Sequence, residues 1–233
     1  MNNPSLNFKL DMPFDQWTGN AFLSFDGKDI FSNSVLRDHP KLLECKTMDK
    51  DARKAFVNEY VAIFYKEHEK ELEAAVERMS KDWSDISEGF FKQVDQLFPE
   101  NSGEYKWLDG TYTCYLSIFN CNPRFIKDKY FQAYYKHSET VNYVCMHELL
   151  HFAFYDYLER NFPKVFTSLG EDGMWKLSEI FNDVVFRQPS FVEITKQVTP
   201  NFYAESMEEL EKFVKMWEKN PSVNSFVKNY LQS

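Results

Sequence analysis

The sequence predicts an α+β fold that is mostly helical and contains a small β-sheet. Apolar residues recur at helical spacing over residues 51–98 and again from residue 139 onward. Between these regions, residues 111–119 and 129–135 form two short stretches rich in β-branched and aromatic residues, which is typical of strands. Hydrophobic residues make up 43% of the 233 residues, so the chain can bury a substantial core in one compact domain.

The N-terminal part divides into an irregular segment and a helical one. Residues 1–50 mix proline, asparagine, aspartate and aromatics without sustained periodicity, so we expect irregular structure and short elements there. Residues 51–98 predict two long amphipathic helices with a break near MSKDWSD, residues 79–85. The charged stretch KEHEKELEAAVER, residues 66–78, is expected to form the solvated face of the first helix.

Helical periodicity returns after the predicted strands. The expected helices cover residues 139–159, about 171–187, 205–219 and 222–231. We therefore expect an N-terminal irregular segment and helical hairpin lobe at 1–100. A catalytic core is expected at 101–233, and the two regions together form one compact domain.

Charge and cysteine content narrow the functional classes. The formal net charge is −9, with no local lysine and arginine cluster, which disfavours nucleic acid as a partner. No basic flank precedes an apolar run, and no apolar run approaches the length of a membrane span, so we expect a cytoplasmic protein that does not contact a membrane. The cysteines form no CxxC pair and are expected to be reduced core thiols: Cys45, Cys114, Cys121 and Cys145.

Two histidines in the apolar stretch VNYVCMHELLHFAFYDYLER, residues 141–160, predict a metal site. In a helix, His147 and His151 lie one turn apart on one face, so both imidazoles can reach one ion, and Glu148 lies beside it. The pattern H-E-x-x-H arises by chance in on the order of one chain in a hundred of this length. Burying both histidines without partners would cost a few kcal/mol. A third ligand is therefore expected.

Glu179 is the best candidate for that third ligand. Zinc in catalytic sites usually takes three protein ligands, and no histidine follows the second one of the pair. Glu179 lies in MWKLSEIFNDVVFRQ, where Trp175 and the apolar residues after it predict a mostly buried helix. Asp183 follows one turn later on the same face, where it can support a metal-bound imidazole.

The motif HELLH followed by E-x-x-x-D resembles the gluzincin metallopeptidases, which are typified by thermolysin-like enzymes. The resemblance implies a zincin-like fold with an HExxH active-site helix and Zn²⁺ held by His147, His151 and Glu179. It also implies that Glu148 is the general base, that Asp183 orients His147, and that the predicted strand 129–135 forms a sheet edge over the cleft. The match covers about 60 residues of the C-terminal half.

Two departures from the gluzincin pattern bear on these assignments. The 28 positions from His151 to Glu179 exceed the spacing in many gluzincins, so Glu171, Asp156 and Glu159 remain alternative ligands. The Gly-x-Met-x-Asn element of gluzincin aminopeptidases is absent, which favours an endopeptidase.

The expected function is hydrolysis of peptide bonds in extended or unfolded protein segments by a metal-activated water. A second donor should stabilise the oxyanion, and Tyr203 is our candidate beside Tyr155, Tyr157 and Arg187. Two alternatives remain open. One is a regulatory peptidase of the ImmA/IrrE type that cuts one specific protein, and the other is a non-catalytic zincin-like protein that binds metal.

Overall fold

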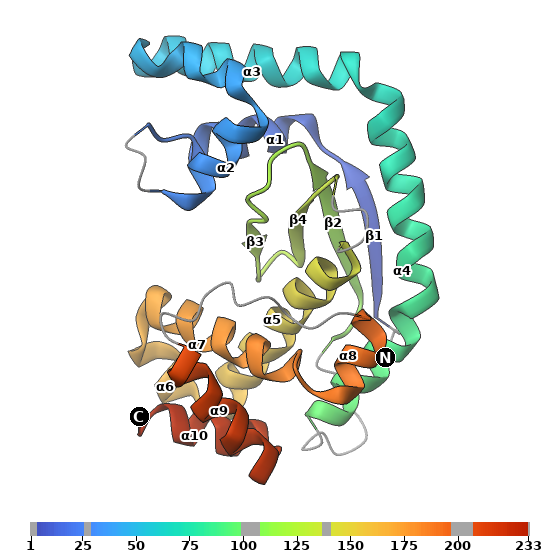
Figure 1. Cartoon of the computed structure of the whole chain (residues 1–233), viewed down its shortest axis with the longest axis vertical. Helices are drawn as coiled ribbons and strands as arrows, with labels where there is room; N and C mark the ends of the chain where they lie inside the picture. Colours follow the sequence, from blue (N-terminus) through green and yellow to red (C-terminus); the bar gives the residue numbers. More distant parts are fainter. Residues whose placement is uncertain (1–3, 26–28, 99–107, 137–140, 197–206, 233) are drawn as a thin grey trace. The chain divides into compact units, whose positions relative to one another are not determined.

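The structure is a computed structural model (Figure 1). The residues that it describes are 4–25, 29–98, 108–136, 141–196 and 207–232. The chain separates into two compact units that interleave along the sequence. The sheet unit comprises residues 6–83 and 111–145, and the triad unit comprises residues 1–5, 84–110 and 146–233. Neither unit coincides with the ranges 1–100 and 101–233 expected from the sequence.

The sheet has four strands in the order β1-β2-β4-β3. They are β1 (Ser5–Leu10), β2 (Thr111–Ser117), β3 (Arg124–Phe125) and β4 (Tyr130–Tyr134). Strands β2 and β4 pair in parallel, and β3 pairs antiparallel with β4. The two predicted strands are thus confirmed, and β1 and β3 are additions to them. The α+β class is confirmed as a mostly helical chain with a small mixed sheet.

The expectation that strand 129–135 forms a sheet edge is wrong. Strand β4 lies between β2 and β3, so the two edges of the sheet are β1 and β3. The short β3 pairs with Tyr130 and Phe131 of β4, and Gln132 N donates a 2.9 Å hydrogen bond to Pro123 O. Because these β4 positions already have main-chain partners, a peptide cannot add to them without displacing residues 123–125.

Three helices of the sheet unit begin at aspartates that cap them. The helices of this region are α1 (Met12–Phe22), α2 (Ile30–Asp38), the 3₁₀ helix η1 (Pro40–Thr47) and α3 (Lys50–Glu67). The caps Asp11, Asp29 and Asp49 each accept a hydrogen bond from a main-chain N–H of the first turn. These caps explain how ordered helices arise where the apolar pattern is weak.

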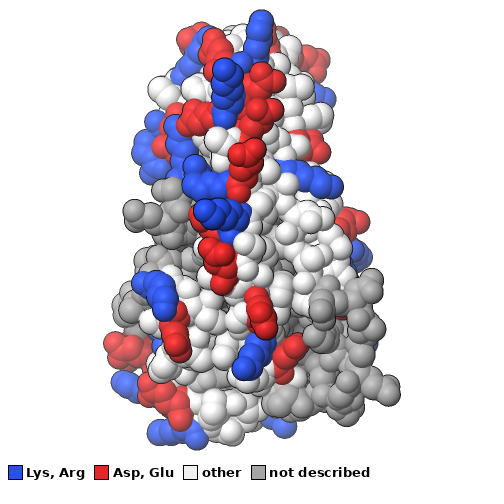
Figure 2. All heavy atoms as spheres, turned by 90° about the vertical axis from the view of Figure 1, so that its right-hand side faces the viewer, with Lys and Arg blue, Asp and Glu red and all other residues white. Residues whose placement is uncertain are grey.

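Helix α4 (Glu69–Leu97) begins earlier than predicted. The expected break at residues 79–85 is wrong, because α4 runs through them without interruption and buries Met79 and Trp83 on its apolar side. The break lies at His68, whose ring stacks on Phe64 with centroids 4.2 Å apart and whose Nδ1 lies 2.8 Å from Glu71 Oε2. The stretch 66–78 therefore belongs mainly to the second helix. Figure 2 shows positive and negative side chains interspersed on the side of the molecule that carries α4.

A buried polar network joins α1 to the sheet and to α3. Its centre is Asp15, which is fully buried and belongs to α1. The carboxylate accepts hydrogen bonds from four groups, namely Ser117 Oγ, Gln132 Nε2, Tyr65 Oη and Ile118 N. Burial raises the pKa of Asp15 to about 6, although the four hydrogen bonds act in the opposite direction.

The triad unit is built from helices packed around aromatic side chains. Its helices after α4 are α5 (Val141–Asn161, of which residues 146–161 belong to this unit), α6 (Pro163–Ser168), α7 (Gly170–Val185), α8 (Pro189–Thr195), α9 (Met207–Lys219) and α10 (Val223–Tyr230). The rings of Phe154 and Phe181 stack 4.0 Å apart, and Phe226 packs edge-on against Phe181 at 5.3 Å. The four predicted helices are confirmed, and α6 and α8 are additional short ones that begin at prolines.

Three further expectations concern the cysteines, the exposure of Trp175 and the apolar length of the helices. The four cysteines are buried and form no disulfide, as predicted. Trp175 is not part of the buried face of α7, because 42% of its surface is exposed. Among the residues that the structure describes, no helix is long and apolar enough to cross a membrane.

Candidate metal centre

Helices α5 and α7 run in opposite directions and pack against each other in the triad unit. His147, near the beginning of α5, has its ring 6.2 Å from that of Phe186, just after the end of α7. One turn later on α5, His151 lies beside Glu179, which comes earlier on α7. The apolar residues of both helices fix this packing, and the polar side chains of both meet within it.

Three side chains from these helices converge on one point. The Nε2 atoms of His147 and His151 lie 2.9 Å apart. Glu179 Oε2 lies 3.1 Å from His147 Nε2, and Oε1 lies 3.4 Å from His151 Nε2. The side chains of His151 and Glu179 are 0% and 2% exposed, and that of His147 is 13% exposed. We call these three residues the metal triad, because their ligand atoms form a group that could hold a metal ion.

The donor spacing fits a small metal ion. Bonds of about 2.0–2.2 Å in a tetrahedral zinc site place neighbouring ligand atoms roughly 3.3–3.6 Å apart. The three separations of 2.9, 3.1 and 3.4 Å approach this range, so a small outward movement of the side chains admits an ion. Two imidazole nitrogens and one carboxylate oxygen are a ligand set of catalytic zinc sites, although imidazole also suits other transition metals.

The surroundings of Glu179 lower the pKa of its carboxyl. Burial alone would raise the pKa of this carboxyl, but the charge of His151 and the hydrogen bonds from both histidines together hold the pKa well below its usual range. An ionised carboxylate is the form that binds a metal ion.

The part of α7 after Glu179 lies against His147. Asn182 is fully buried, and its Nδ2 donates a 2.9 Å hydrogen bond to the main-chain carbonyl of His147. Asp183 accepts from Arg187 Nη1 at 3.5 Å, and the same nitrogen donates to the Asp183 carbonyl at 2.8 Å. Burial raises the pKa of Asp183, whereas the charges of Arg187 and His147 lower it. Asp183 is thus close enough to His147 to interact with it electrostatically, and its role in orienting the imidazole stays a prediction.

Glu148 is a buried acidic residue next to one member of the metal triad in the sequence. It is 4% exposed and lies on α5 directly after His147. Three residues of α-helix correspond to a rotation of about 300°, so Glu148 lies roughly 60° around α5 from His151. It therefore borders the metal triad without being part of it.

The chain was compared with protein-family models, with curated proteins and with solved structures. None of the three comparisons found a match. The gluzincin resemblance therefore rests on the residues of the sequence and stays a prediction.

The alternative third ligands are not brought to the triad. Glu171 and Glu159 are exposed, and Asp156 pairs with Arg160 at 3.0 Å. Glu179 therefore stands as the third member of the group. Sequence reasoning missed Asn182, which packs under His147. Its placement in the buried run EIFNDVV was the available signal, since a buried amide requires a hydrogen-bond partner.

The candidate oxyanion donors have different surroundings. Tyr203 lies outside the described residues. The ring of Tyr155 lies 6.5 Å from that of His151. Tyr157 is buried and packs against Phe98 at 5.2 Å, and Arg187 binds Asp183. Of the described candidates, Tyr155 and Arg187 contact residues that belong to or adjoin the metal triad.

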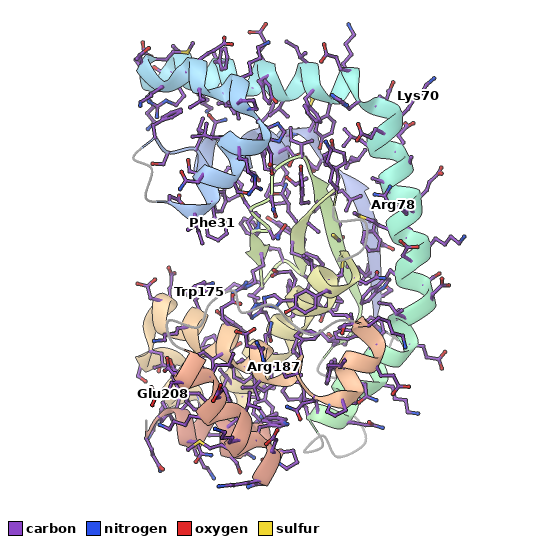
Figure 3. All side chains as sticks on the ribbon, in the orientation of Figure 1. Phe31, Lys70, Arg78, Trp175, Arg187 and Glu208 are labelled. Carbon is purple, nitrogen blue, oxygen red and sulfur yellow. The ribbon has the colours of Figure 1, made fainter. Side chains whose placement is uncertain are left out.

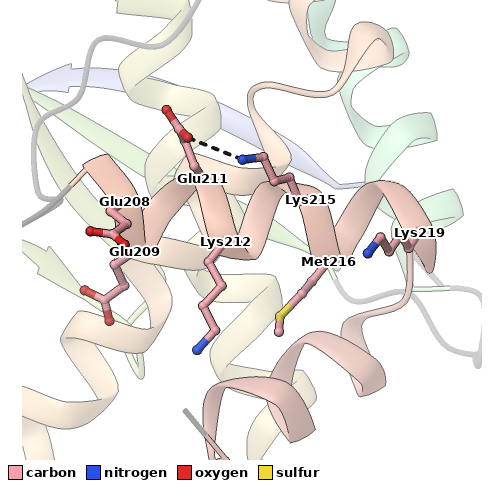
Figure 4. A pocket seen from close by; sticks show the side chains of 7 residues that line it. All are labelled: Glu208, Glu209, Glu211, Lys212, Lys215, Met216 and Lys219. Carbon is pink, nitrogen blue, oxygen red and sulfur yellow. Dashed lines mark ion pairs between the residues drawn. The ribbon is translucent and has the colours of Figure 1, made fainter.

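A surface hollow on α9 is separate from this centre. Figure 4 shows it lined by seven residues of that helix, with an ion pair of 3.5 Å between Glu211 and Lys215. Its lining contains acidic and basic side chains of similar number and none of the metal triad. We assign the hollow to the solvated face of α9.

Proposed function

We propose that this protein is a zinc-dependent peptidase that hydrolyses peptide bonds, acting as an endopeptidase on extended or unfolded segments. The observation that carries the proposal is the convergence of His147, His151 and Glu179 beside a buried Glu148. The cytoplasm is the compartment that we propose for it. This function does not require nucleic acid or a membrane as a partner.

Each residue has a distinct task in the proposed reaction. His147, His151 and Glu179 would hold the ion. Zinc bound there would polarise the scissile carbonyl and lower the pKa of a water molecule towards about 7. Glu148 would take a proton from the attacking water and deliver it to the leaving amine, as a positioned general acid–base group does.

Three residues are candidates for the second oxyanion donor. Tyr203 remains our sequence-based candidate. Tyr155 and Arg187 gain support because their neighbours His151 and Asp183 belong to or adjoin the metal triad. A donor that acts on the oxyanion should affect the rate of hydrolysis more than substrate affinity.

The deciding experiment combines metal analysis with the variant Glu148→Gln. The purified wild-type protein should hold close to one zinc ion per chain, and His151→Ala should lose it. Glu148→Gln should fold and hold zinc as the wild type does, because a glutamine keeps the size of the side chain and its capacity for hydrogen bonding. Hydrolysis of casein should nevertheless fall at least about a hundredfold, the lower range for losing a positioned base.

The other outcomes point to the alternatives. Zinc binding without cleavage of casein or of a broad peptide library would favour a regulatory peptidase with one substrate or a protein that only binds metal. A folded protein without affinity for zinc would contradict the proposal. Equal hydrolysis by wild type and Glu148→Gln would show that the proposed chemistry is wrong.

A further inference from the structure

One stripe of α7 carries the third member of the metal triad together with an exposed aromatic side chain. Trp175 precedes Glu179 by four residues, so the two side chains lie on one face of α7, about 6 Å apart along its axis. Trp175 is 42% exposed, whereas Glu179 is 2% exposed. Figure 3 labels Trp175, in the second turn of α7, and Arg187, just after the end of that helix. This face of α7 therefore extends from the buried carboxylate of Glu179 to the exposed indole ring of Trp175.

The face of α5 that carries the two histidines also leads to an aromatic side chain. Tyr155 follows His151 by four residues, and their rings meet edge to face with centroids 6.5 Å apart. Tyr155 is half-buried and meets Phe166 of α6 edge to face at 6.3 Å. Because α5 and α7 run in opposite directions, the turn after His151 and the turn before Glu179 lie at the same end of the metal triad. We call Tyr155, Phe166 and Trp175 the aromatic shelf.

Two acidic side chains lie close to the aromatic shelf. Glu171 and Asp172 precede Trp175 by four and three residues, which places them one turn away on its side of α7. Both side chains are exposed. Acidic residues are favourable in the first turn of a helix, which accounts for their type but not for the exposed indole beside them. An exposed aromatic surface with carboxylates at its border complements a cation on an apolar stem.

We propose that the aromatic shelf binds an arginine or lysine side chain of the substrate, close to the bond that is cut. The inference rests on the proposed peptidase function and names its substrate preference. An extended peptide advances about 3.3 Å per residue, so a distance of about 6 Å from Glu179 corresponds to one or two residues. The bound side chain would therefore belong to one of the two residues nearest the scissile bond on that side.

Arginine suits the shelf for three physical reasons. Its planar guanidinium stacks on aromatic rings, and indole is the best cation–π partner. Its aliphatic stem can cover the apolar surface of Tyr155 and Phe166. Its charge can pair with the carboxylates of Glu171 and Asp172, and the net charge of −9 adds a long-range attraction for basic peptides.

The test measures binding rather than hydrolysis. Zinc-loaded protein is titrated in a calorimeter with the hydroxamates of arginine, of its neutral analogue citrulline, and of phenylalanine, each of which places one side chain next to a metal-binding group. The wild type should bind the arginine hydroxamate about tenfold more tightly than the citrulline hydroxamate, the sum expected from one exposed cation–π contact and two surface charge pairs.

Substitutions in the aromatic shelf and in the acidic residues beside it test whether they cause the preference for arginine. Trp175→Ala should reduce the arginine preference to less than about threefold, and Trp175→Phe should restore most of it, because a phenyl ring also attracts a cation. The double variant Glu171→Gln and Asp172→Asn should weaken binding of arginine hydroxamate and leave that of citrulline hydroxamate unchanged. Glu211→Gln, which removes an exposed acid of α9 outside the shelf, should change neither affinity (Figure 4).

Each negative result of this experiment would overturn a different part of the proposal. Tightest binding of phenylalanine hydroxamate would show an apolar subsite and overturn the basic occupant. Equal binding of all three hydroxamates would overturn the subsite while the metal centre stands. A protein that takes up zinc but binds no hydroxamate, or that takes up no zinc, would overturn the proposed function itself and the inference with it.

Discussion

The amide of Asn182 donates a 2.9 Å hydrogen bond to the main-chain carbonyl of His147, and so joins α7 to the helix that carries both histidines. Asn182 is fully buried and follows Glu179 by three residues on α7. One helix therefore supplies a member of the metal triad and also fixes the main chain beneath another member. The position of His147 is coupled to α7 through its main chain as well as through its side chain.

The identity of the third ligand can be tested by a pair of matched substitutions. Glu179→Gln removes the charge of a buried carboxylate that lies 3.1 Å from His147, and should weaken zinc binding by more than about a hundredfold. Glu171→Gln makes the same chemical change at an exposed position of the same helix and should leave zinc affinity unchanged. Competition with a chromophoric chelator measures both. Unchanged affinity in Glu179→Gln would move the third ligand elsewhere.

The proposed support of His147 by Asp183 can be tested by a substitution, with Asp156 as the matched control residue. Asp183→Asn should cost roughly 10–100-fold in zinc affinity or activity, which is less than the loss of a ligand. Asp156 also pairs with an arginine four residues later, at a site outside the metal triad. Asp156→Asn should therefore leave zinc affinity and activity as they are. Full affinity and activity in Asp183→Asn would show that its carboxylate serves only Arg187.

Metal removal should lower the stability of the folded chain. At free zinc a hundred times the dissociation constant, binding adds about 2.7 kcal/mol to the free energy of unfolding. In a chain of this size that corresponds to roughly 5–10 °C in Tm, which differential scanning calorimetry with and without a chelator can measure. His151→Ala should show no such shift. An equal shift in that variant would mean that zinc acts outside the metal triad.

Stability should also depend on the ionisation of Asp15. Its folded pKa of about 6 lies above the ordinary value of 3.8, so the folded state favours the protonated carboxyl. The stability that Asp15 contributes is present below about pH 4 and is lost as pH rises through 6. The loss amounts to about 3 kcal/mol by pH 7, by the linkage between pKa and unfolding.

The variant Asp15→Asn isolates this titration. It removes the ionisable group but keeps the shape of the side chain, so the wild type should lose stability relative to the variant as pH rises from 4.5 to 7. Urea denaturation of both proteins at the two pH values measures the difference. His39 lies near the network and remains in both proteins, so its titration cancels. Tyr65 donates to Asp15 and has a raised pKa, so it stays protonated over this pH range. A wild type that gains stability relative to the variant over this range would contradict the raised pKa.

The sequence predicted the metal triad better than it predicted the sheet. His147, His151 and Glu179 lie on strongly periodic helices, and a helix fixes which side chains share a face. Strand pairing depends on residues far apart in the chain, so β1 was missed and β4 was wrongly placed at an edge. The helix break at His68 depends on a ring stacked on Phe64, and no proline or glycine marks it.

The network around Asp15 has a consequence for the order in which the nascent chain can acquire structure. Asp15 and Thr18 contact Ser117 and Gln132, so these bonds close loops of about a hundred residues, and such high contact order slows folding. Residues 6–83 belong to the sheet unit, which is completed only by residues 111–145. At a synthesis rate of about 5–20 residues per second, the N-terminal helices wait roughly 3–12 seconds for their strands. During that interval the Asp15 carboxylate and the aromatic rings of α1 lack the strands that pack against them in the folded protein.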